Sequence, residues 1–225
     1  MRRPQPVHGV LFDLDGTLLD TAPDMVGALN ELRMLEGIAP LPFESLRQHV
    51  SHGSARLVSV GFGLDAGDEY ERLRQRFLDV YRARVASDTR PFDGMEAVLA
   101  AVESAGFGWG IVTNKPGWLT EPLLQELGLR ERCACVVSGD TLHVRKPHPA
   151  PLLHAAEALG LPPVHCTYVG DAERDIQAGR AAGMRTLVAA FGYLGDDDDP
   201  AAWGADGIVS TPLDILGWLG LEMAA

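Results

Sequence analysis

The chain has 225 residues, of which 46% are hydrophobic, enough for one large globular domain or a domain with a smaller insert. Its formal net charge of −12 disfavours nucleic acid and anionic lipid as partners. The three cysteines lack the spacing of a disulfide framework or a zinc knuckle, and no stretch of about 20 apolar residues could span a membrane. Because the apolar run at Val10–Phe12 is also too short for a signal peptide, we expect a cytoplasmic protein with reduced thiols.

Short apolar runs alternate with helical patterns along most of the chain. The runs are rich in β-branched residues and cover 7–12, 109–113, 134–138, 166–170, 186–190 and 207–210. Apolar side chains on successive positions are typical of strands that are buried on both faces. Helical periods follow at 95–105, 120–127, 150–159, 176–182 and 213–219. The alternation predicts an α/β fold with a doubly wound parallel sheet, in which ligands lie beyond the carboxyl ends of the strands.

One interval interrupts this alternation between the first strand and position 91. It has helical patterns at 23–35, 43–50, 54–60 and 68–85. Residues 21–90 hold nine Arg against ten acidic residues, whereas the rest holds ten basic against twenty-one acidic residues. We therefore expect a small helical domain at 21–89, inserted into a core domain made of 1–20 and 90–225. The connectors near 18–21 and 89–92 would then act as hinges.

Polar residues follow several of the expected strands. They are Asp13 and Asp15, then Thr113, Asn114 and Lys115, then Asp171 and Asp175, while a loop supplies Lys146. The carboxyl ends of parallel strands meet at one edge of a sheet, so these side chains should converge there. Four carboxylates in one cleft repel each other unless positive charge lies among them. Lys146 supplies one charge, and Mg²⁺, which prefers oxygen ligands, would supply two.

The lysines support this interpretation. Nineteen residues are Lys or Arg, and only two of these are lysines, Lys115 and Lys146. Both lie in the polar segments that follow the strands. A compact ammonium group fits between carboxylate and phosphate groups where a planar guanidinium does not.

Four motifs now carry a resemblance to a known family. DLDGTLLD resembles the first motif of the haloacid dehalogenase superfamily, DxDGT; VTNK resembles the second, Lys146 in GDTLHVRKPHP the third, and GDAERD the fourth. The helical insert is similar to the superfamily's cap domain. The segments DTAPD, VSHGSARLV, WGIVTNKP, GDAERDI and WGAD resemble the phosphoglycolate phosphatase branch and, within it, the N-acetylmuramic acid 6-phosphate phosphatases.

The resemblance implies a two-step phosphoryl transfer. Asp13 would attack phosphorus and form an aspartyl-phosphate, and Asp15 would protonate the leaving alcohol and then accept a proton from water. Lys146 would neutralise developing charge and orient Asp13.

The resemblance also implies the groups that hold phosphate and metal. Phosphate would bind to the backbone after Gly16, including Thr17, and to Thr113, Asn114 and Lys115. Mg²⁺ would be held by Asp13, Asp171 and the backbone carbonyl of Asp15, with Asp175 behind them. Two alternatives stay open here, since Asp175 could cap a helix and Asn114 could form a turn. Lys115 could point into the cleft or into solvent.

The insert offers candidates for substrate recognition. Arg56 could face a substrate carboxylate, or lie on a solvated helix face. The charged run at 72–84 is expected to be a solvated face, and Asp196–Asp199 a hydrated loop. His49 and His52 lack the carboxylate partners of a zinc site.

The expected function is that of a Mg²⁺-dependent phosphatase acting on a small phosphorylated organic acid or sugar, within carbohydrate metabolism. Phosphoglycolate is the first candidate substrate and N-acetylmuramic acid 6-phosphate the alternative. Phosphate transfer of the β-phosphoglucomutase type, haloacid dehalogenation and a non-catalytic phosphosugar-binding role are further alternatives. Asp15 argues against dehalogenation, and the lack of lysine in residues 21–90 argues against a phosphonatase. The protein is expected to be a monomer or a homodimer.

Overall fold

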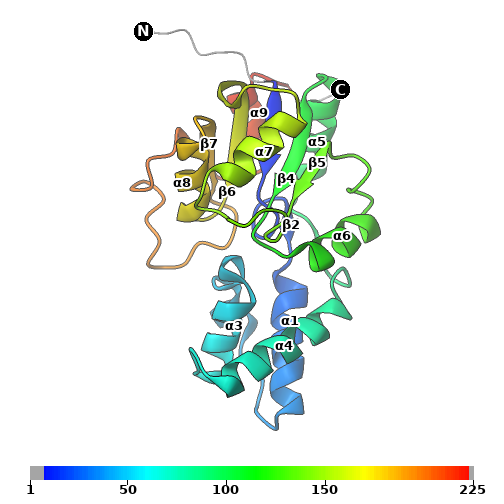
Figure 1. The fold of residues 1–225 in the computed structure, drawn as a ribbon, viewed down its shortest axis with the longest axis vertical. Helices are drawn as coiled ribbons and strands as arrows, with labels where there is room; N and C mark the ends of the chain where they lie inside the picture. The colour runs from blue at the N-terminus through cyan, green and yellow to red at the C-terminus, as the bar shows by residue number, and fades with distance from the viewer. Residues whose placement is uncertain (1–7, 223–225) are drawn as a thin grey trace.

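The computed structural model describes residues 8–222 (Figure 1). Its centre is a six-stranded parallel sheet with the order β5-β4-β1-β6-β7-β8. The strands are β1 Gly9–Phe12, β4 Gly108–Val112, β5 Cys135–Val137, β6 Cys166–Gly170, β7 Arg185–Ala189 and β8 Gly207–Val209. The doubly wound α/β fold expected from the sequence is thus confirmed, although Val7, the first residue of the run at 7–12, lies outside the described residues.

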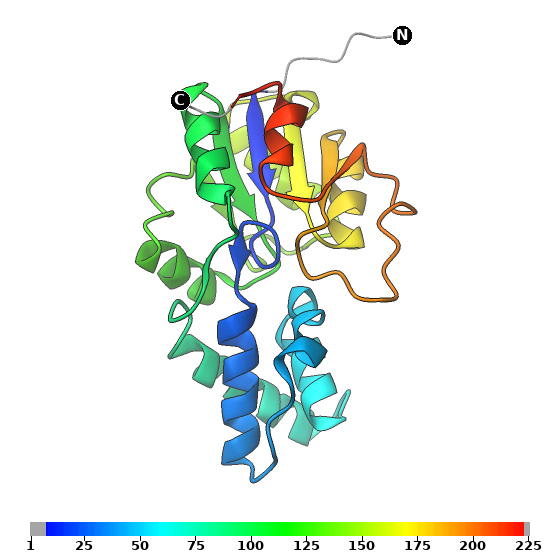
Figure 2. The ribbon, with the colours of Figure 1, turned by 180° about the vertical axis from the view of Figure 1, so that it is seen from behind.

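The central strand β1 shows why successive apolar residues form this sheet. All four of its residues are buried. Leu11 packs with the side chains of α7 (Ala150–Ala158) and α8 (Glu173–Ala181), while Val10 and Phe12 pack with those of α5 (Met95–Ser104) and α9 (Asp214–Leu219). Figures 1 and 2 show these two helix layers on opposite faces of the sheet. Because β1 lies between β4 and β6, the loops after these three strands meet at the carboxyl edge.

Four helices lie beyond this edge and form what we call the helical insert, residues 22–82 (Figure 1). They are α1 Ala22–Leu35, α2 Phe43–Arg47, α3 Gly53–Phe62 and α4 Asp68–Arg82, with a short turn, η1 Val50–His52, between α2 and α3. Leu29, Leu57 and Phe77 are fully buried where α1, α3 and α4 pack together. The insert therefore has apolar packing of its own.

Two short strands join the insert to the sheet. β2 Leu19–Asp20 pairs antiparallel with β3 Arg90–Pro91. Beside them, the buried carboxylate of Asp24 accepts hydrogen bonds from the backbone N–H groups of Asp88 and Thr89 and from the Thr89 hydroxyl, at 2.8 to 2.9 Å. The chain segment that enters the insert is thus hydrogen-bonded to the segment that leaves it.

Several boundaries differ from the sequence expectation. Helix α6 spans Gly117–Glu126 and α8 begins at Glu173, three residues before the apolar periods at 120 and 176. The first turn of α8 is polar, with Glu173, Arg174 and Asp175, so apolar periodicity does not detect it; α6 begins at Gly117, directly after Pro116. The helix expected at 43–50 ends at Arg47 and gives way to η1. The two-residue strands β2 and β3, and the turn η2 Pro163–His165, are too short for a periodic signal.

Candidate active site

The loop after β1 turns at Gly16, where a side chain would be strained. Gly16 has a φ of +85°, and a Cβ atom built there would lie 2.1 Å from Oδ2 of Asp171. The turn brings Asp13 and Asp15 to the carboxyl edge of the sheet, and Asp13 N–H donates to the carbonyl of Val169 at 2.9 Å. The sequence thus folds its paired carboxylates against the end of β6.

Lys146 is buried between two carboxylates. Its Nζ lies 2.9 Å from Oδ1 of Asp13 and 2.8 Å from Oδ1 of Asp175, and it donates to the Tyr168 hydroxyl at 2.7 Å. The side chains of Lys146 and Asp175 are completely inaccessible to solvent. Asp175 also accepts the backbone N–H of Ala172 at the start of α8, at 3.1 Å, so it both caps the helix and holds the lysine.

A third carboxylate, that of Asp171, completes a compact acidic cluster. Asp13, Asp171 and Asp175 each offer an oxygen within 4.8 Å of the others. Burial raises the pKa of Asp13 to about 6 although Lys146 opposes the shift, and burial together with the neighbouring Asp13 and Asp175 raises the pKa of Asp171 to about 7. Burial and mutual repulsion thus disfavour the charged forms of Asp13 and Asp171, and the clustered oxygens fit a divalent cation.

Asp171 also contacts the helical insert. It accepts hydrogen bonds from the hydroxyls of Thr17 at 3.3 Å and Ser51 at 2.5 Å and from the backbone N–H of Tyr193 at 3.1 Å. Arg174, the second residue of α8, donates to the carbonyl of Ser51 at 2.6 Å. The insert thus sits directly against the acidic cluster through η1.

Asp15 is held by a different set of partners from Asp13. Its Oδ1 accepts hydrogen bonds from Lys115 Nζ at 2.8 Å and from the Thr21 hydroxyl at 2.7 Å. Lys115 Nζ also donates to the hydroxyl of Tyr81 on α4 at 2.7 Å. Burial disfavours the charge on Lys115, but Asp15 and Tyr81 outweigh it and raise its pKa above the ordinary value, so Lys115 is an ammonium ion. Burial raises the pKa of Tyr81 to about 12.

The loop after β4 supports the Lys146 loop. The Asn114 amide donates to the carbonyl of Lys146 at 3.0 Å and accepts the Lys146 N–H at 3.1 Å. The side chain of Asn114 is therefore engaged with the backbone, while the buried hydroxyl of Thr113 accepts the N–H of Lys115 at 3.1 Å. Both residues line the cavity described next.

A cavity of about 480 Å³ lies between the sheet edge and the insert. Asp13, Asp15 and Lys115 line its core side, and Phe77 and Tyr81 of α4 line the facing side. Three arginines also line it: Arg74, Arg145 and Arg174. Asp171, Gly16 and Thr17 are not part of the cavity wall; they lie behind it, around the acidic cluster.

Some residues singled out in the sequence lie elsewhere. Arg56 is exposed on α3 and does not line the cavity. The run at 72–84 is mostly solvated, but Arg74 departs from that expectation and faces the cavity together with Phe77 and Tyr81, three and seven residues further along α4.

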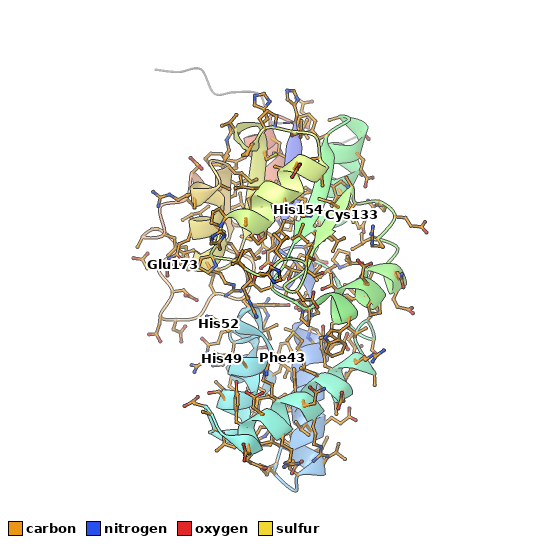
Figure 3. The ribbon with its side chains drawn as sticks, viewed as in Figure 1. Phe43, His49, His52, Cys133, His154 and Glu173 are labelled. Atoms are coloured by element: carbon orange, nitrogen blue, oxygen red, sulfur yellow. The ribbon has the colours of Figure 1, made fainter. Side chains whose placement is uncertain are left out.

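His49 and His52 lie at the end of the insert nearest the sheet (Figure 3). Partial burial lowers the pKa of both, with Arg56 adding to the shift of His49 and Arg174 to that of His52. The loop Asp196–Asp199 is exposed. No helix within residues 8–222 is both long and apolar enough to cross a membrane.

Sequence reasoning missed the residues that the insert contributes. Tyr81 follows Phe77 in the apolar period of α4, so its pattern is that of a packing residue. Ser51 lies in a turn without periodicity, and Arg74 is one of several arginines in the same helix.

Comparison with known proteins agrees with this geometry. Residues 10–189 match the model of a family described as haloacid dehalogenase-like hydrolase. A phosphoglycolate phosphatase of Xylella fastidiosa strain Temecula1 is 50% identical over 204 residues, covering 90% of this chain and 89% of the relative. An N-acetylmuramic acid 6-phosphate phosphatase of Pseudomonas aeruginosa PAO1 is 45% identical over 211 residues, covering 93% of each chain.

Solved structures show the same fold. A crystal structure of a predicted phosphoglycolate phosphatase from Haemophilus somnus 129PT superposes with a TM-score of 0.83 at 25% identity, covering 94% of this chain and 97% of the other. The family match spans strands β1 to β7, the acidic cluster and the insert. The chain therefore belongs to the haloacid dehalogenase-like hydrolase family.

Proposed function

We propose that this protein is a Mg²⁺-dependent phosphatase that hydrolyses a small phosphorylated organic acid or sugar through an aspartyl-phosphate. One observation carries the proposal. Asp13 and Asp15 face the same cavity, one beside the Lys146 ammonium and the acidic cluster, the other beside Lys115. That arrangement separates a nucleophile from a proton carrier. The two phosphatase relatives support the same activity.

Asp13 is the nucleophile in this account. Its Oδ1 is held by Lys146 at 2.9 Å and by the N–H of Leu14 at 2.7 Å, which leaves Oδ2 to attack phosphorus. As the bond from Asp13 to phosphorus forms, the bond to the leaving oxygen breaks and that oxygen takes a proton from Asp15. Water then attacks phosphorus, gives its proton to Asp15 and releases Asp13. Lys146 neutralises charge that develops on the transferred group.

The acidic cluster would hold the cation. Asp13, Asp171 and the backbone carbonyl of Asp15 are the proposed ligands, with Asp175 holding Lys146 and the loop behind them. When bound, Mg²⁺ supplies positive charge that screens the carboxylates from each other and from the phosphate. The backbone after Gly16, including Thr17, and the groups of Thr113, Asn114 and Lys115 are the proposed phosphate donors.

Phosphoglycolate is the first candidate substrate. Its carboxylate needs a cationic partner away from the phosphate, and the cavity offers Arg74, Arg145 and Arg174, in place of the Arg56 expected from the sequence. N-acetylmuramic acid 6-phosphate is the second candidate. A volume of about 480 Å³ with Phe77 in its wall suits a sugar with an apolar substituent, and the Pseudomonas relative carries that activity.

The insert, within residues 21–89, acts as a cap that closes over bound substrate and excludes water, with hinges at 18–21 and 89–92. The paired strands β2 and β3 in these connectors support that division. The protein works in the cytoplasm as a monomer or homodimer. Its three free cysteines agree with a reducing compartment, and light scattering after size exclusion would determine the oligomeric state.

Hydrolysis of p-nitrophenyl phosphate with Mg²⁺, and its loss in EDTA, tests the reaction class. A dehalogenase would show no metal-dependent hydrolysis, a phosphosugar-binding protein would show no turnover, and a phosphate-transfer enzyme would form a second phosphate ester in place of inorganic phosphate. A panel of kcat/KM values for 2-phosphoglycolate, N-acetylmuramic acid 6-phosphate and common sugar phosphates identifies the substrate. Values near those of p-nitrophenyl phosphate for every compound would contradict both candidate substrates.

A further inference from the structure

A chain of three side chains runs from the helical insert to the proposed proton carrier. The Tyr81 hydroxyl of α4 accepts a hydrogen bond from Lys115 Nζ at 2.7 Å, and the same Nζ donates to Asp15 Oδ1 at 2.8 Å. Nζ also lies 4.6 Å from the centre of the Tyr81 ring. Lys115 is therefore fixed at once by the core and by the insert.

The contacts at Asp15 leave one of its oxygens available. Within residues 8–222, both hydrogen bonds that its carboxylate receives end on Oδ1, one from Lys115 at 2.8 Å and one from Thr21 at 2.7 Å. Two donors on a single oxygen fix the plane of the carboxylate. Oδ2 remains for the cavity, which Asp15 lines. A proton can pass between Asp15 and a reacting oxygen only when that oxygen lies within hydrogen-bond reach of Oδ2.

Burial makes this arrangement stiff. The Lys115 side chain is 4% exposed, and Tyr81 is 1% exposed. The Tyr81 ring is stacked on Phe77 with its centre 6.1 Å away. The lysine has a long flexible side chain, and its position depends on the two acceptors at its end. Removing one acceptor frees the ammonium group to turn away from Asp15.

We infer that Tyr81 is a positioning residue, which acts through Lys115 to hold Asp15 in the orientation that delivers a proton to the leaving oxygen. The inference rests on the proposed phosphatase function. In the step concerned, the Asp13–phosphorus bond forms, the bond from phosphorus to the leaving oxygen breaks, and the proton moves from Asp15 to that oxygen. Because Tyr81 belongs to the insert, the hydrogen-bond chain from Tyr81 through Lys115 to Asp15 forms only while the insert is packed against the sheet edge.

Two aryl esters of nearly the same shape test the inference. Phenyl phosphate releases a poor leaving group that needs a proton, since phenols such as tyrosine have a pKa of about 10. p-Nitrophenyl phosphate releases a good leaving group that departs without one. The value of kcat/KM reports only the steps up to release of the alcohol, so the later use of Asp15 as a base does not affect the comparison.

Tyr81→Phe removes the hydroxyl and keeps the stacked ring. We expect it to lower kcat/KM for phenyl phosphate about tenfold relative to p-nitrophenyl phosphate, the effect of losing about one hydrogen bond in the transition state. Lys115→Met should shift the same ratio further in the same direction. The matched control is Tyr70→Phe, which removes from the same helix a hydroxyl that donates to the backbone carbonyl of Ala55 and to neither Lys115 nor Asp15; its ratio should equal that of the wild type.

An equal loss on both esters in Tyr81→Phe would mean that Tyr81 serves the shape of the cavity and would overturn the inference, as would no loss on either ester. Failure of the wild-type protein to hydrolyse any phosphate ester is a different result, which contradicts the proposed function itself. Thermal unfolding of each variant confirms that the fold is retained.

Discussion

The two walls of the cavity are built in different ways. On the core side, the carboxylates and lysines are buried and each is bonded to partners that come from other strand ends, as Lys146 is to Asp13 and Asp175. On the insert side, Arg74 is 39% exposed at its side chain and pairs with Glu71 on its own helix. The core wall is therefore rigid and suited to chemistry. On the insert wall, Phe77 and Tyr81 are buried, whereas the partly exposed Arg74 can adapt and suits selection of the substrate.

Loss of the nucleophile should give the largest effect. Asp13→Asn keeps the size of the side chain but removes the attacking oxygen and the charge that pairs with Lys146. We expect kcat to fall by at least about 10⁴-fold while the fold remains intact. Steady-state kinetics with p-nitrophenyl phosphate, together with circular dichroism, would measure this. Substantial turnover in the variant would contradict the role assigned to Asp13.

Loss of the proton carrier should rank second. Asp15→Asn leaves the nucleophile in place but removes proton transfer to the leaving oxygen, so kcat/KM for alkyl phosphates should fall by about 10²–10⁴-fold. The fall should be smaller for p-nitrophenyl phosphate, whose leaving group needs no proton. A uniform loss across substrates would point to a binding role for Asp15 instead.

The insert wall should show an effect on selectivity. Arg74→Ala should lower kcat/KM for a carboxylated substrate such as 2-phosphoglycolate about 10- to 100-fold, the typical range for a lost charged hydrogen bond, and leave p-nitrophenyl phosphate much less affected. Arg56→Ala removes the same charge from the neighbouring helix and serves as the control, because Arg56 is exposed away from the cavity. If the two substitutions lowered kcat/KM equally, Arg74 would act only through its long-range positive charge and not through direct contact with the substrate carboxylate.

The smallest expected effect is a pH dependence of the stabilisation that the metal gives to the fold. The pKa of Asp13, raised to about 6 mainly by burial, and that of Asp171, raised to about 7 mainly by burial, both lie above the ordinary value of 3.8. The metal-free folded state thus binds more protons than the unfolded state, and the contribution of these groups to stability is lost as pH rises through about 4 to 7.

A divalent cation must displace those protons, so the increase in Tm caused by Mg²⁺ should be larger at about pH 8 than at about pH 5. Calorimetry with and without the metal would measure the difference, and Asp171→Asn should reduce it. If the increase in Tm caused by Mg²⁺ were the same at both pH values, the cation would bind somewhere other than the acidic cluster.

The core wall could be predicted from the sequence to a large extent. Parallel strands put their carboxyl ends on one edge, so Asp13, Asp15 and Asp171 had to converge once β1, β4 and β6 were recognised. The rarity of lysine identified Lys115 and Lys146 before their contacts were known. These inferences depend only on the strands being parallel, which the alternation of apolar runs with helical patterns indicates; that β1 lies between β4 and β6 is known from the structure.

The insert wall could not be predicted in the same way. Which arginine of α3 or α4 faces the cavity depends on how the helices are rotated against the sheet edge, and periodicity fixes only the apolar side of each helix. Arg56 and Arg74 therefore could not be told apart. Tyr81 lies at the end of the apolar stripe of α4, where a single hydroxyl reaches Lys115. Such a contact between two separate parts of the chain leaves no local pattern.

The most direct measurement is a search for phosphate bound covalently to Asp13. Asp15→Asn can still react with p-nitrophenyl phosphate but lacks the base for hydrolysis of the aspartyl-phosphate, so the intermediate should accumulate. After a rapid acid quench, mass spectrometry of the peptide with residues 11–20 should show the mass of one phosphoryl group on Asp13. A variant that releases p-nitrophenol yet carries no phosphate there would contradict the account.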